Sequence, residues 1–548
     1  MKTYKRLLMS FGVAALVLSS CDTKFDEINN NPDKPVDVLT SGIMTRVQYD
    51  IAYNYYDAWQ GLRMNGVICQ HWSQRIYTPE DRYDFSARTG TVSYFFNLAY
   101  RTIELGNKIA STIEKDPIGT LNYGDHIMQI STMNILKAFL IEQNVETYGD
   151  VPYRDANNIL EIAQPKYDTQ EFIFKDLLKQ LKKANDDLKG TKGWTKGDII
   201  FNGDVDKWRK FANSLRLRIA MRISNVDPAF SKAEAAAAIA DGVMESNADN
   251  AAFHFIGPGS PNQAPLYSDY ESRFDFTPTW QFTNMLLGND DKGKGYVNPF
   301  NGIIDPRLKQ IAVAPMNQDS KTYNTEGMPY GLDDDMNAAV WDVIQDKAIY
   351  YGPTKGKSDE ALQKPIQAKF WSTLMDYTNV VLFQAELNNN DRSLFQKGVE
   401  ASLATWGVPD AEKMAYVSSV MSKFDAANDE VKYEMIITQK YIHNFAHFDQ
   451  EALHEYRRTE LPKMLVLPGE QTGYKYTIKV EQDNGEIKSE ERIFKFITSD
   501  GSTKIMQRML YPVTESTFNR ANLNAAIASM GGDDQKIPLY YSKTYKKK

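Results

Sequence analysis

The chain has 548 residues, of which 63 are Lys or Arg and 71 are Asp or Glu, so its formal net charge is −8 at neutral pH. This acidic balance argues against nucleic acid as a partner, because nucleic-acid binding depends on clustered Lys and Arg. The mean hydropathy is −0.49, and no segment after the first twenty residues approaches the ~20 consecutive apolar residues of a membrane-spanning helix.

The first residues predict an export signal. Basic residues precede a mostly apolar core, Leu7–Leu18, which is too short to stay in a bilayer as a permanent helix. The order Leu18-Ser19-Ser20-Cys21 then looks like a bacterial lipobox, in which the cysteine thiol is acylated. We therefore expect residues 1–20 to be a signal peptide and Cys21 to be lipidated. An ordinary signal peptide that ends near a cysteine is the alternative.

The segment after Cys21 has the composition of a tether. Asp22–Thr40 is polar and is interrupted by Pro32 and Pro35, so we expect residues 21–40 to form a lipidated, flexible connection. Cys69 is then the one remaining cysteine, and no disulfide is expected. Because it lies in an apolar stretch, a buried structural role is favoured over a reactive one.

From about Gly42 apolar residues recur at spacings of three and four, which predicts helices. The clearest case is Trp208–Ile223, where Trp208, Phe211, Leu215 and Ile219 share one face. The other helices are predicted over Tyr94–Ile113, Ile127–Thr147, Thr169–Leu188, Ala233–Ala240, Thr378–Leu387, Leu394–Thr405, Ala411–Phe424 and Glu430–Phe448.

Two further patterns interrupt the helical one. Residues 250–364 are rich in Gly, Pro and aromatic residues, which predicts a loop-rich insert with a function. Tyr474–Ile497 alternates between apolar and polar residues on either side of Asn484-Gly485, which predicts a β-hairpin. Residues 378–405 read as a helical hairpin of the tetratricopeptide-like kind, although no strict 34-residue period is present.

Several charged groups have both a chemical and a structural interpretation. His443 and His447 have the i, i+4 spacing of metal ligands, but no Glu follows His443, so structural histidines are favoured and no metal is expected. Asn289–Asp291 and Asp333–Asp335 could bind calcium, but acidic turns are favoured. Five basic residues on the Trp208 helix are expected to pair with carboxylates inside the body: Arg209, Lys210, Arg216, Arg218 and Arg222.

Two loop stretches, residues 71–85 and 267–280, combine aromatic and hydrogen-bonding residues and favour a binding function over a catalytic one. A sugar ring has an apolar face and a hydroxyl rim, and it therefore requires a flat aromatic surface beside hydrogen-bonding groups. The alternative is that these aromatic rings attach long loops to the body. The candidate ligand residues are Trp72, Tyr77, Arg82, Tyr83, Tyr267, Asp269, Tyr270, Arg273 and Trp280.

A set of short motifs resembles the SusD/RagB family of nutrient-binding outer-membrane lipoproteins of Bacteroidetes, in its SusD-like branch. The motifs occur in order along nearly the whole chain after Cys21. Leu387 departs from the family pattern, because a small residue is expected after Ala385-Glu386. The matching segments are Phe25–Pro32, Tyr148–Tyr153, Trp208–Arg218, Asp305–Leu308, Phe383–Glu386, Tyr456–Thr459 and Arg508–Pro512, with Asn519 and Asn522.

The resemblance implies a mainly α-helical domain over residues 41–548, in which tetratricopeptide-like helical hairpins support a loop-rich ligand face. It also implies a protein without catalysis or cofactor that captures a glycan oligomer at the cell surface. Its partner would be a SusC-like TonB-dependent transporter in the outer membrane. A peptide-import lid of the RagB type is the alternative within the family. A lipid-anchored glycan hydrolase remains open, because two carboxylates at a set separation suffice for that chemistry, and a purely structural surface protein is a third possibility.

Overall fold

A computed structural model describes residues 39–546, apart from residues 60, 274, 292, 313–325, 333–348, 350 and 483–484 and the side chains of residues 474 and 478–481. The predicted signal peptide, Cys21 and most of the tether lie outside the described residues. The acidic run Asp333–Asp335 and Asn484 of the predicted hairpin turn lie outside them as well.

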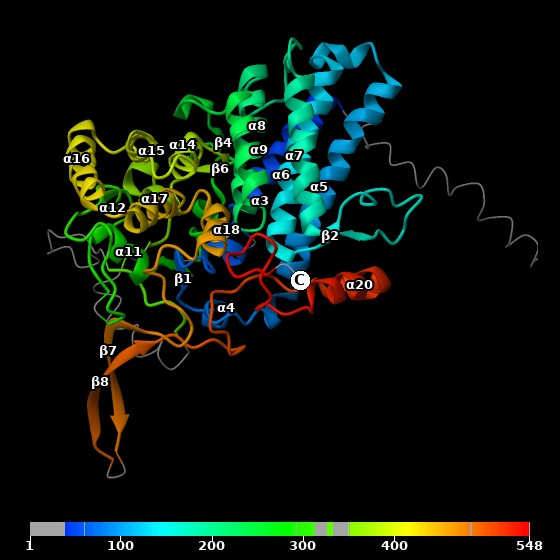
Figure 1. Cartoon of the computed structure of the whole chain (residues 1–548). Helices are drawn as coiled ribbons and strands as arrows, with labels where there is room; N and C mark the ends of the chain where they lie inside the picture. The colour runs from blue at the N-terminus through cyan, green and yellow to red at the C-terminus, as the bar shows by residue number, and fades with distance from the viewer. Residues whose placement is uncertain are drawn as a thin grey trace, which may run out of the picture.

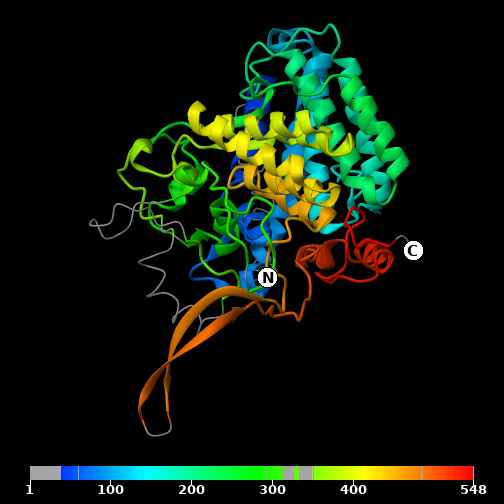
Figure 2. The ribbon, with the colours of Figure 1, turned by 60° about the vertical axis from the view of Figure 1, so that its left-hand side comes forward.

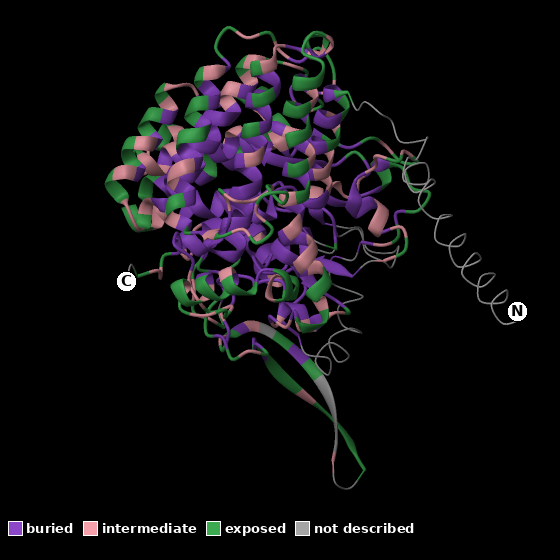
Figure 3. Cartoon of the chain, turned by 90° about the vertical axis from the view of Figure 1, so that its right-hand side faces the viewer, coloured by how far each residue is buried: buried purple, intermediate pink, exposed green. Residues whose placement is uncertain are grey.

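Helices dominate the described chain, so the predicted fold class is confirmed. The helices of the first half stand side by side in Figure 1, and each of α5 to α8 contacts the next helix along the chain. Figure 3 shows that their facing sides form a continuous buried interior. They are α3 (Thr40–Asn54), α5 (Thr89–Lys115), α6 (His126–Tyr148), α7 (Gln170–Asp187), α8 (Val205–Arg222) and α9 (Pro228–Ala240).

Local sequence explains where several of these helices begin and end. The Asp204 side chain accepts a hydrogen bond from the backbone N–H of Lys207 at 3.0 Å, which caps α8, and Thr169 caps α7 in the same way. Gly149 ends α6 with a φ of +102°, a conformation that side chains disfavour. The Tyr148–Tyr153 motif is therefore a helix stop and turn.

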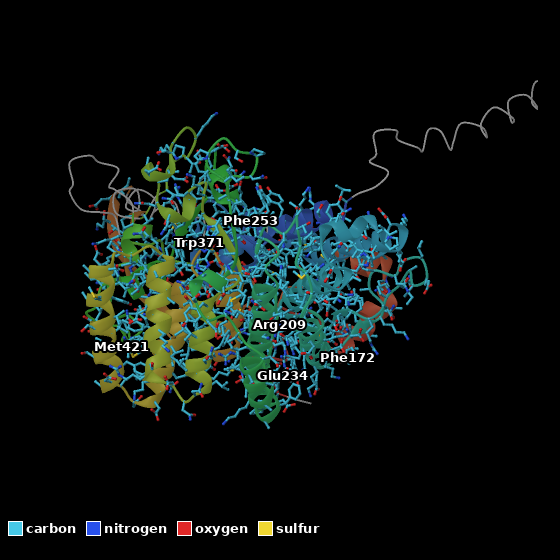
Figure 4. All side chains as sticks on the ribbon, turned by 90° about the horizontal axis from the view of Figure 1, so that it is seen from above. Phe172, Arg209, Glu234, Phe253, Trp371 and Met421 are labelled. Carbon is cyan, nitrogen blue, oxygen red and sulfur yellow. The ribbon has the colours of Figure 1, made fainter. Side chains whose placement is uncertain are left out.

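A second group of helices forms antiparallel hairpins: α14 (Tyr377–Leu387), α15 (Arg392–Thr405), α16 (Asp410–Ala426), α17 (Asp429–His443) and α18 (Asp449–Thr459). A Cβ atom at Gly398 of α15 would lie 2.4 Å from the Leu382 side chain of α14, so only glycine allows these helices to cross this closely. Figure 4 shows Met421 of α16 and Phe172 of α7 at opposite sides of the molecule, with the other labelled residues between them.

One helix boundary was predicted wrongly. The pattern predicts a single helix over Glu430–Phe448, but α17 ends at His443 and α18 begins only at Asp449. Ala446 has a φ of +67°, and its backbone N–H donates to the Asp449 carboxylate at 2.9 Å. Because Asp449 is held by partners from distant segments, this turn is set by tertiary contacts that the local pattern does not contain.

The strands pair only in twos within the described chain, and every pair is antiparallel. The pairs are β1 (Trp72–Gln74) with β5 (Phe276–Pro278), β2 (Val151–Pro152) with β3 (Tyr167–Asp168), β4 (Ala251–His254) with β6 (Trp371–Met375), and β7 (Gln471–Glu481) with β8 (Ile487–Lys495). The predicted hairpin is thus present as β7–β8, and Figures 1 and 2 show that it projects away from the helical body.

Short helices connect these parts, and several lie in the region predicted to be rich in loops. They are η1 (Leu62–Gly66), α4 (Thr78–Asp81), η2 (Ser86–Arg88), η3 (Gly119–Tyr123), η4 (Ile223–Asn225), η5 (Asn247–Asp249), α10 (Pro265–Asp269), α11 (Trp280–Leu287), α12 (Leu308–Ile311), η6 (Asp359–Ala361), η7 (Lys364–Ile366), α19 (Val513–Phe518) and α20 (Arg520–Met530).

The basic residues of α8 pair with carboxylates, as predicted. Arg218 and Arg222 are fully buried and meet acidic residues of α6 and α18. The Arg222 Nε lies 2.6 Å from a Glu146 oxygen, and its Nη2 lies 2.6 Å from a Glu451 oxygen. We call this set the buried ion network; its members are Glu142, Glu146, Arg218, Arg222, Lys440, Glu451, Glu455 and Arg458.

Candidate functional site

The two loop stretches selected from the sequence lie side by side. Strand β1, from the first stretch, pairs with β5, from the second, in a register that places Gln74 opposite Phe276. The pairing continues one step further, because the Arg75 N–H donates to the Asp275 carbonyl at 2.7 Å. The residues just beyond, Tyr77 and Arg273, therefore meet, and the Arg273 Nη2 donates to the Tyr77 hydroxyl at 2.7 Å.

Around this contact lies a cluster of aromatic rings and guanidinium groups. The Arg273 guanidinium carbon lies 5.2 Å from the centre of the Trp59 ring and 5.4 Å from that of Tyr77. Arg63 lies 4.4 Å from the Trp59 ring, and Arg88 lies 4.9 Å from the Tyr77 ring. Such distances are favourable for cation–π attraction. We call Trp59, Arg63, Tyr77, Arg88 and Arg273 the arginine–aromatic cluster.

Trp59 is the exposed ring of the cluster. Its side chain is 42% exposed although it lies in the described chain among many buried aromatic residues. Arg63 packs on it and is held in place by Glu80, whose Oε2 lies 2.9 Å from the Arg63 Nε. The exposed part of the ring is accessible to a ligand, although Arg63 and Arg273 both lie over the ring.

Two carboxylates balance part of the positive charge of the cluster. Glu80 pairs with both Arg63 and Arg88, and Asp275 pairs with Arg273 at 2.7 Å. Three guanidinium groups thus share two carboxylates. The cluster is consequently richer in hydrogen-bond donors than in acceptors.

Asp269, from the second stretch, supplies an acceptor next to the cluster. Burial and the nearby Asp275 carboxylate raise the pKa of Asp269 to about 6, although Arg273 and Arg63 oppose this shift. The Asp269 charge also contributes, after burial and Asp57, to raising the pKa of Tyr53 to about 12. The polar face therefore continues from the cluster towards the end of α3.

Four of the predicted ligand residues are buried, and their expected contact with a ligand is not supported. Trp72 is fully buried, stacks on Phe445 and donates from its Nε1 to Asp449 at 3.2 Å. Tyr83 packs edge-on against Phe496. The hydroxyls of Tyr267 and Tyr270 donate to backbone carbonyls, at 3.1 Å to Lys357 and 2.6 Å to Phe276 respectively. These rings attach the loops to the body, which is the alternative stated for them.

The other five predicted residues are partly exposed, but only three come together. Tyr77, Asp269 and Arg273 belong to the face described above. Arg82 lies nearer the C-terminal part, where its carbonyl accepts from the Ser499 N–H at 2.9 Å. Trp280 lies beside Gly473 at the start of β7, where a Cβ atom at that glycine would be 3.5 Å from its ring.

The sequence analysis missed Trp59, Arg63 and Arg88. A signal for the first two was present, because Trp59 ends a tyrosine-rich run and Arg63 follows it by four residues. Because Trp59 and Arg63 lie outside the 71–85 stretch, the sequence did not show that they would contact its residues. Only the fold brings η1 and η2 against the same ring-bearing loops.

Within the described residues, His443, His447 and Asp291 each have structural partners. The His443 ring nitrogens contact Ser402 and Asp376, and the His447 Nε2 donates to the His443 carbonyl at 2.7 Å while its Nδ1 accepts from the Thr373 hydroxyl. The Asp291 carboxylate accepts backbone N–H groups of a tight turn, including that of Gly293 at 3.0 Å. These contacts agree with the structural roles expected for the residues.

The closely paired carboxylates of the buried ion network do not form a hydrolase site. Glu142, Glu146, Glu451 and Glu455 are at most 2% exposed and are bound by Arg and Lys side chains. A substrate sugar cannot reach them in this structure. Their proximity is explained by the charges that they neutralise.

Comparison with known proteins decides the family. Residues 32–487 match the family model SusD-like_2, described as "Starch-binding associating with outer membrane". The chain belongs to this SusD-like family. No curated protein matches the chain.

Solved structures support the SusD-like fold. A chitin-binding SusD homologue from Flavobacterium johnsoniae is 19% identical, with a TM-score of 0.67 over 92% of this chain and 98% of that one. A SusD homologue from Bacteroides uniformis is 21% identical, with a TM-score of 0.66 over 92% of this chain and 100% of that one. Within the described residues no helix is both long and apolar enough to cross a membrane.

Proposed function

We propose that this SusD-like protein captures a glycan oligomer on the arginine–aromatic cluster and delivers it, unmodified, to a SusC-like TonB-dependent transporter. The exposed ring of Trp59 beside Tyr77, Arg273 and Asp269 is the observation that carries this proposal. A sugar ring would stack on Trp59 through its C–H face, while its hydroxyls exchange hydrogen bonds with the neighbouring polar groups. The chitin-binding relatives support a glycan as the ligand class.

The proposal includes an anchor. Cys21 would carry the acyl chains, and at least two chains hold a protein stably on a membrane. The protein would face the cell exterior and hinge over the transporter as a lid. Replacing Cys21 with Ser should release the protein from the membrane fraction, and a variant that stays membrane-bound without acylation would contradict the anchor.

Binding is tested with the chain from Asp22 onward against chitin oligomers, malto-oligosaccharides and short peptides. A ligand that binds should raise the melting temperature, and the shift should grow with the logarithm of ligand concentration above Kd. The Trp59→Ala variant should lose this shift. Each bound ligand should be recovered intact, and the appearance of shorter fragments would contradict a non-enzymatic role.

A peptide is the second candidate ligand. The guanidinium groups of the cluster favour ligands with free carboxylates, because Arg binds carboxylates through paired hydrogen bonds. A shift with acidic peptides and none with either oligosaccharide series would select this alternative. A shift with oligosaccharides alone would select the glycan.

A further inference from the structure

Exposed aliphatic side chains gather at one end of the helical body, where the connection between α5 and α6 meets the start of α3. Ile118 is 82% exposed, and the others are between 38% and 54% exposed. In Figure 1 this connection lies at the upper end of the molecule and the β7–β8 hairpin at the lower end. We call this set the apical patch; its members are Leu39, Ile118, Leu121, Ile127, Ile130 and Ile199.

Three segments distant in sequence are joined rigidly beneath the patch. The Thr195 N–H donates to the Tyr123 carbonyl at 3.1 Å, which ties the 189–199 loop to η3. The Thr45 hydroxyl donates to the Gly197 carbonyl at 2.9 Å, and the Ile199 N–H donates to the Gln48 side chain at 2.7 Å, which tie the same loop to α3. The aliphatic side chains are therefore presented on a fixed surface.

A group of exposed aliphatic side chains of this kind is expected to contact another surface. Single exposed aliphatic residues are ordinary on proteins, whereas a group of them at one place marks an interaction site. Exposed lysines stand at its edge, namely Lys115, Lys192 and Lys196. The neighbouring carboxylates of Asp116 and Asp125 accept backbone N–H groups of Gly119 and Lys192, and Glu114 is exposed.

The short sequence distance between Cys21 and the patch indicates that the contacting surface is the membrane. Leu39 belongs to the patch and lies 18 residues after Cys21. A flexible chain of that length has an end-to-end distance of about 25 Å. If Cys21 is acylated, the bilayer surface therefore lies within reach of the patch. Exposed aliphatic side chains suit the boundary between acyl chains and headgroups, and the lysines at the edge can reach headgroup phosphates.

We infer that the apical patch rests on the lipid bilayer surface beside the acylated Cys21, as a second membrane contact that orients the body. This inference depends on the anchor proposed above. An anchor at Cys21 does not by itself fix which face of the body is turned toward the membrane, whereas the patch gives the body a preferred face. The ligand face would then be held in one orientation relative to the transporter.

The test supplies the anchor chemically, so that it does not depend on acylation in the cell. The chain from Cys21 onward is coupled through that thiol to a maleimide lipid in phosphatidylcholine vesicles, with or without phosphatidylglycerol. Coupling is selective, because Cys69 is fully buried and burial raises the pKa of its thiol well above the usual range. Hydrogen exchange of residues 116–130 is then compared between coupled and free protein.

We expect exchange in this segment to slow at least about threefold on both kinds of vesicle. The Ile118→Ser/Leu121→Ser variant should lose this protection. In a second measurement, protein that is not coupled to lipid is floated with vesicles, and about tenfold less of the variant than of the wild type should be recovered with them. The matched control is Ile487→Ser, which removes an exposed aliphatic residue from the distant hairpin and should behave as wild type. Unchanged melting temperatures establish that both variants are folded.

Equal exchange in coupled and free wild-type protein would overturn the inference. Protection that requires the transporter partner would overturn it as well and would assign the patch to a protein interface. Palmitate labelling of Cys21 in cells tests the anchor separately. A protein that is not acylated but shows lipid-dependent protection when coupled would therefore contradict the anchor and leave the patch contact supported.

Discussion

Arginine side chains occupy two contrasting environments in this molecule. In the buried ion network, Arg222 is fully buried and contacts three carboxylates from α6 and α18. In the arginine–aromatic cluster, Arg273 keeps 33% of its side chain exposed and lies over the rings of Trp59 and Tyr77. Both sets contain ion pairs, so the presence of an ion pair does not separate structure from binding.

Exposure and the balance of charge do separate them. The buried network matches its cations with at least as many carboxylates, and no donor faces solvent. The cluster has three guanidinium groups that pair directly with two carboxylates, and its Trp59 is 42% exposed. The first arrangement is closed to ligands, whereas the second leaves groups available to a ligand.

The largest contrast is expected in stability. Arg222→Met should lower the free energy of unfolding by about 3–5 kcal/mol, because it leaves several buried carboxylates without their partner. Arg273→Met should lower it by less than about 1 kcal/mol, since its ion pair is partly exposed. Urea denaturation of both variants measures the difference, and equal losses would contradict the distinction between the two sets.

Low pH should also lower the free energy of unfolding through a group in the buried region. Burial, together with the nearby His443, lowers the pKa of His447 to about 3, below its value near 6.5 in the unfolded chain. Its contribution to stability is complete above pH 6.5 and is lost as the pH falls towards 3. The loss from this residue amounts to at most about 5 kcal/mol.

Denaturation curves recorded between pH 7 and pH 3 measure this slope. The His447→Gln variant is the control, and its stability should depend less on pH over that interval. An identical slope in the variant would show that other groups cause the acid sensitivity.

Two tryptophans sharpen the comparison for ligand binding. Trp59→Ala should weaken binding of the captured ligand by about tenfold, the loss of one stacking surface, with little change in melting temperature. Trp72→Ala should instead destabilise the fold by about 3–5 kcal/mol, because it empties a buried site. Calorimetric titration and thermal melts of both variants provide the measurements. Unchanged binding in Trp59→Ala would remove the cluster from the ligand face.

The smallest effect is expected at Asp269. With a pKa of about 6, this carboxyl changes charge between pH 5 and pH 7. For a neutral glycan, affinity should rise about twofold to fivefold over this range, because the ionised carboxylate accepts stronger hydrogen bonds. For a ligand rich in carboxylates it should fall instead. Titrations at the two pH values, with Asp269→Asn as the variant that lacks this dependence, distinguish the two ligand classes.

Local patterns determined most of the helical framework. The periodic stripe from Trp208 to Ile219 and the Asp204 cap specify α8 without reference to the rest of the chain. The excess of acidic residues predicted that the α8 arginines would be paired. The alternation on either side of Asn484-Gly485 likewise predicted the β7–β8 hairpin. These features depend on neighbours in sequence, which a single chain displays directly.

Tertiary contacts decided what local patterns left open. Trp59 and Trp72 are the same residue type in the same part of the chain, yet one is exposed and the other lies between Phe445 and Asp449. The Asp449 contacts also end α17 earlier than its pattern predicted. By itself, the sequence determined most of the helices and the two loop stretches that meet at β1 and β5. Which of their rings face solvent was decided only by packing against partners hundreds of residues away, because burial is a property of the assembled core.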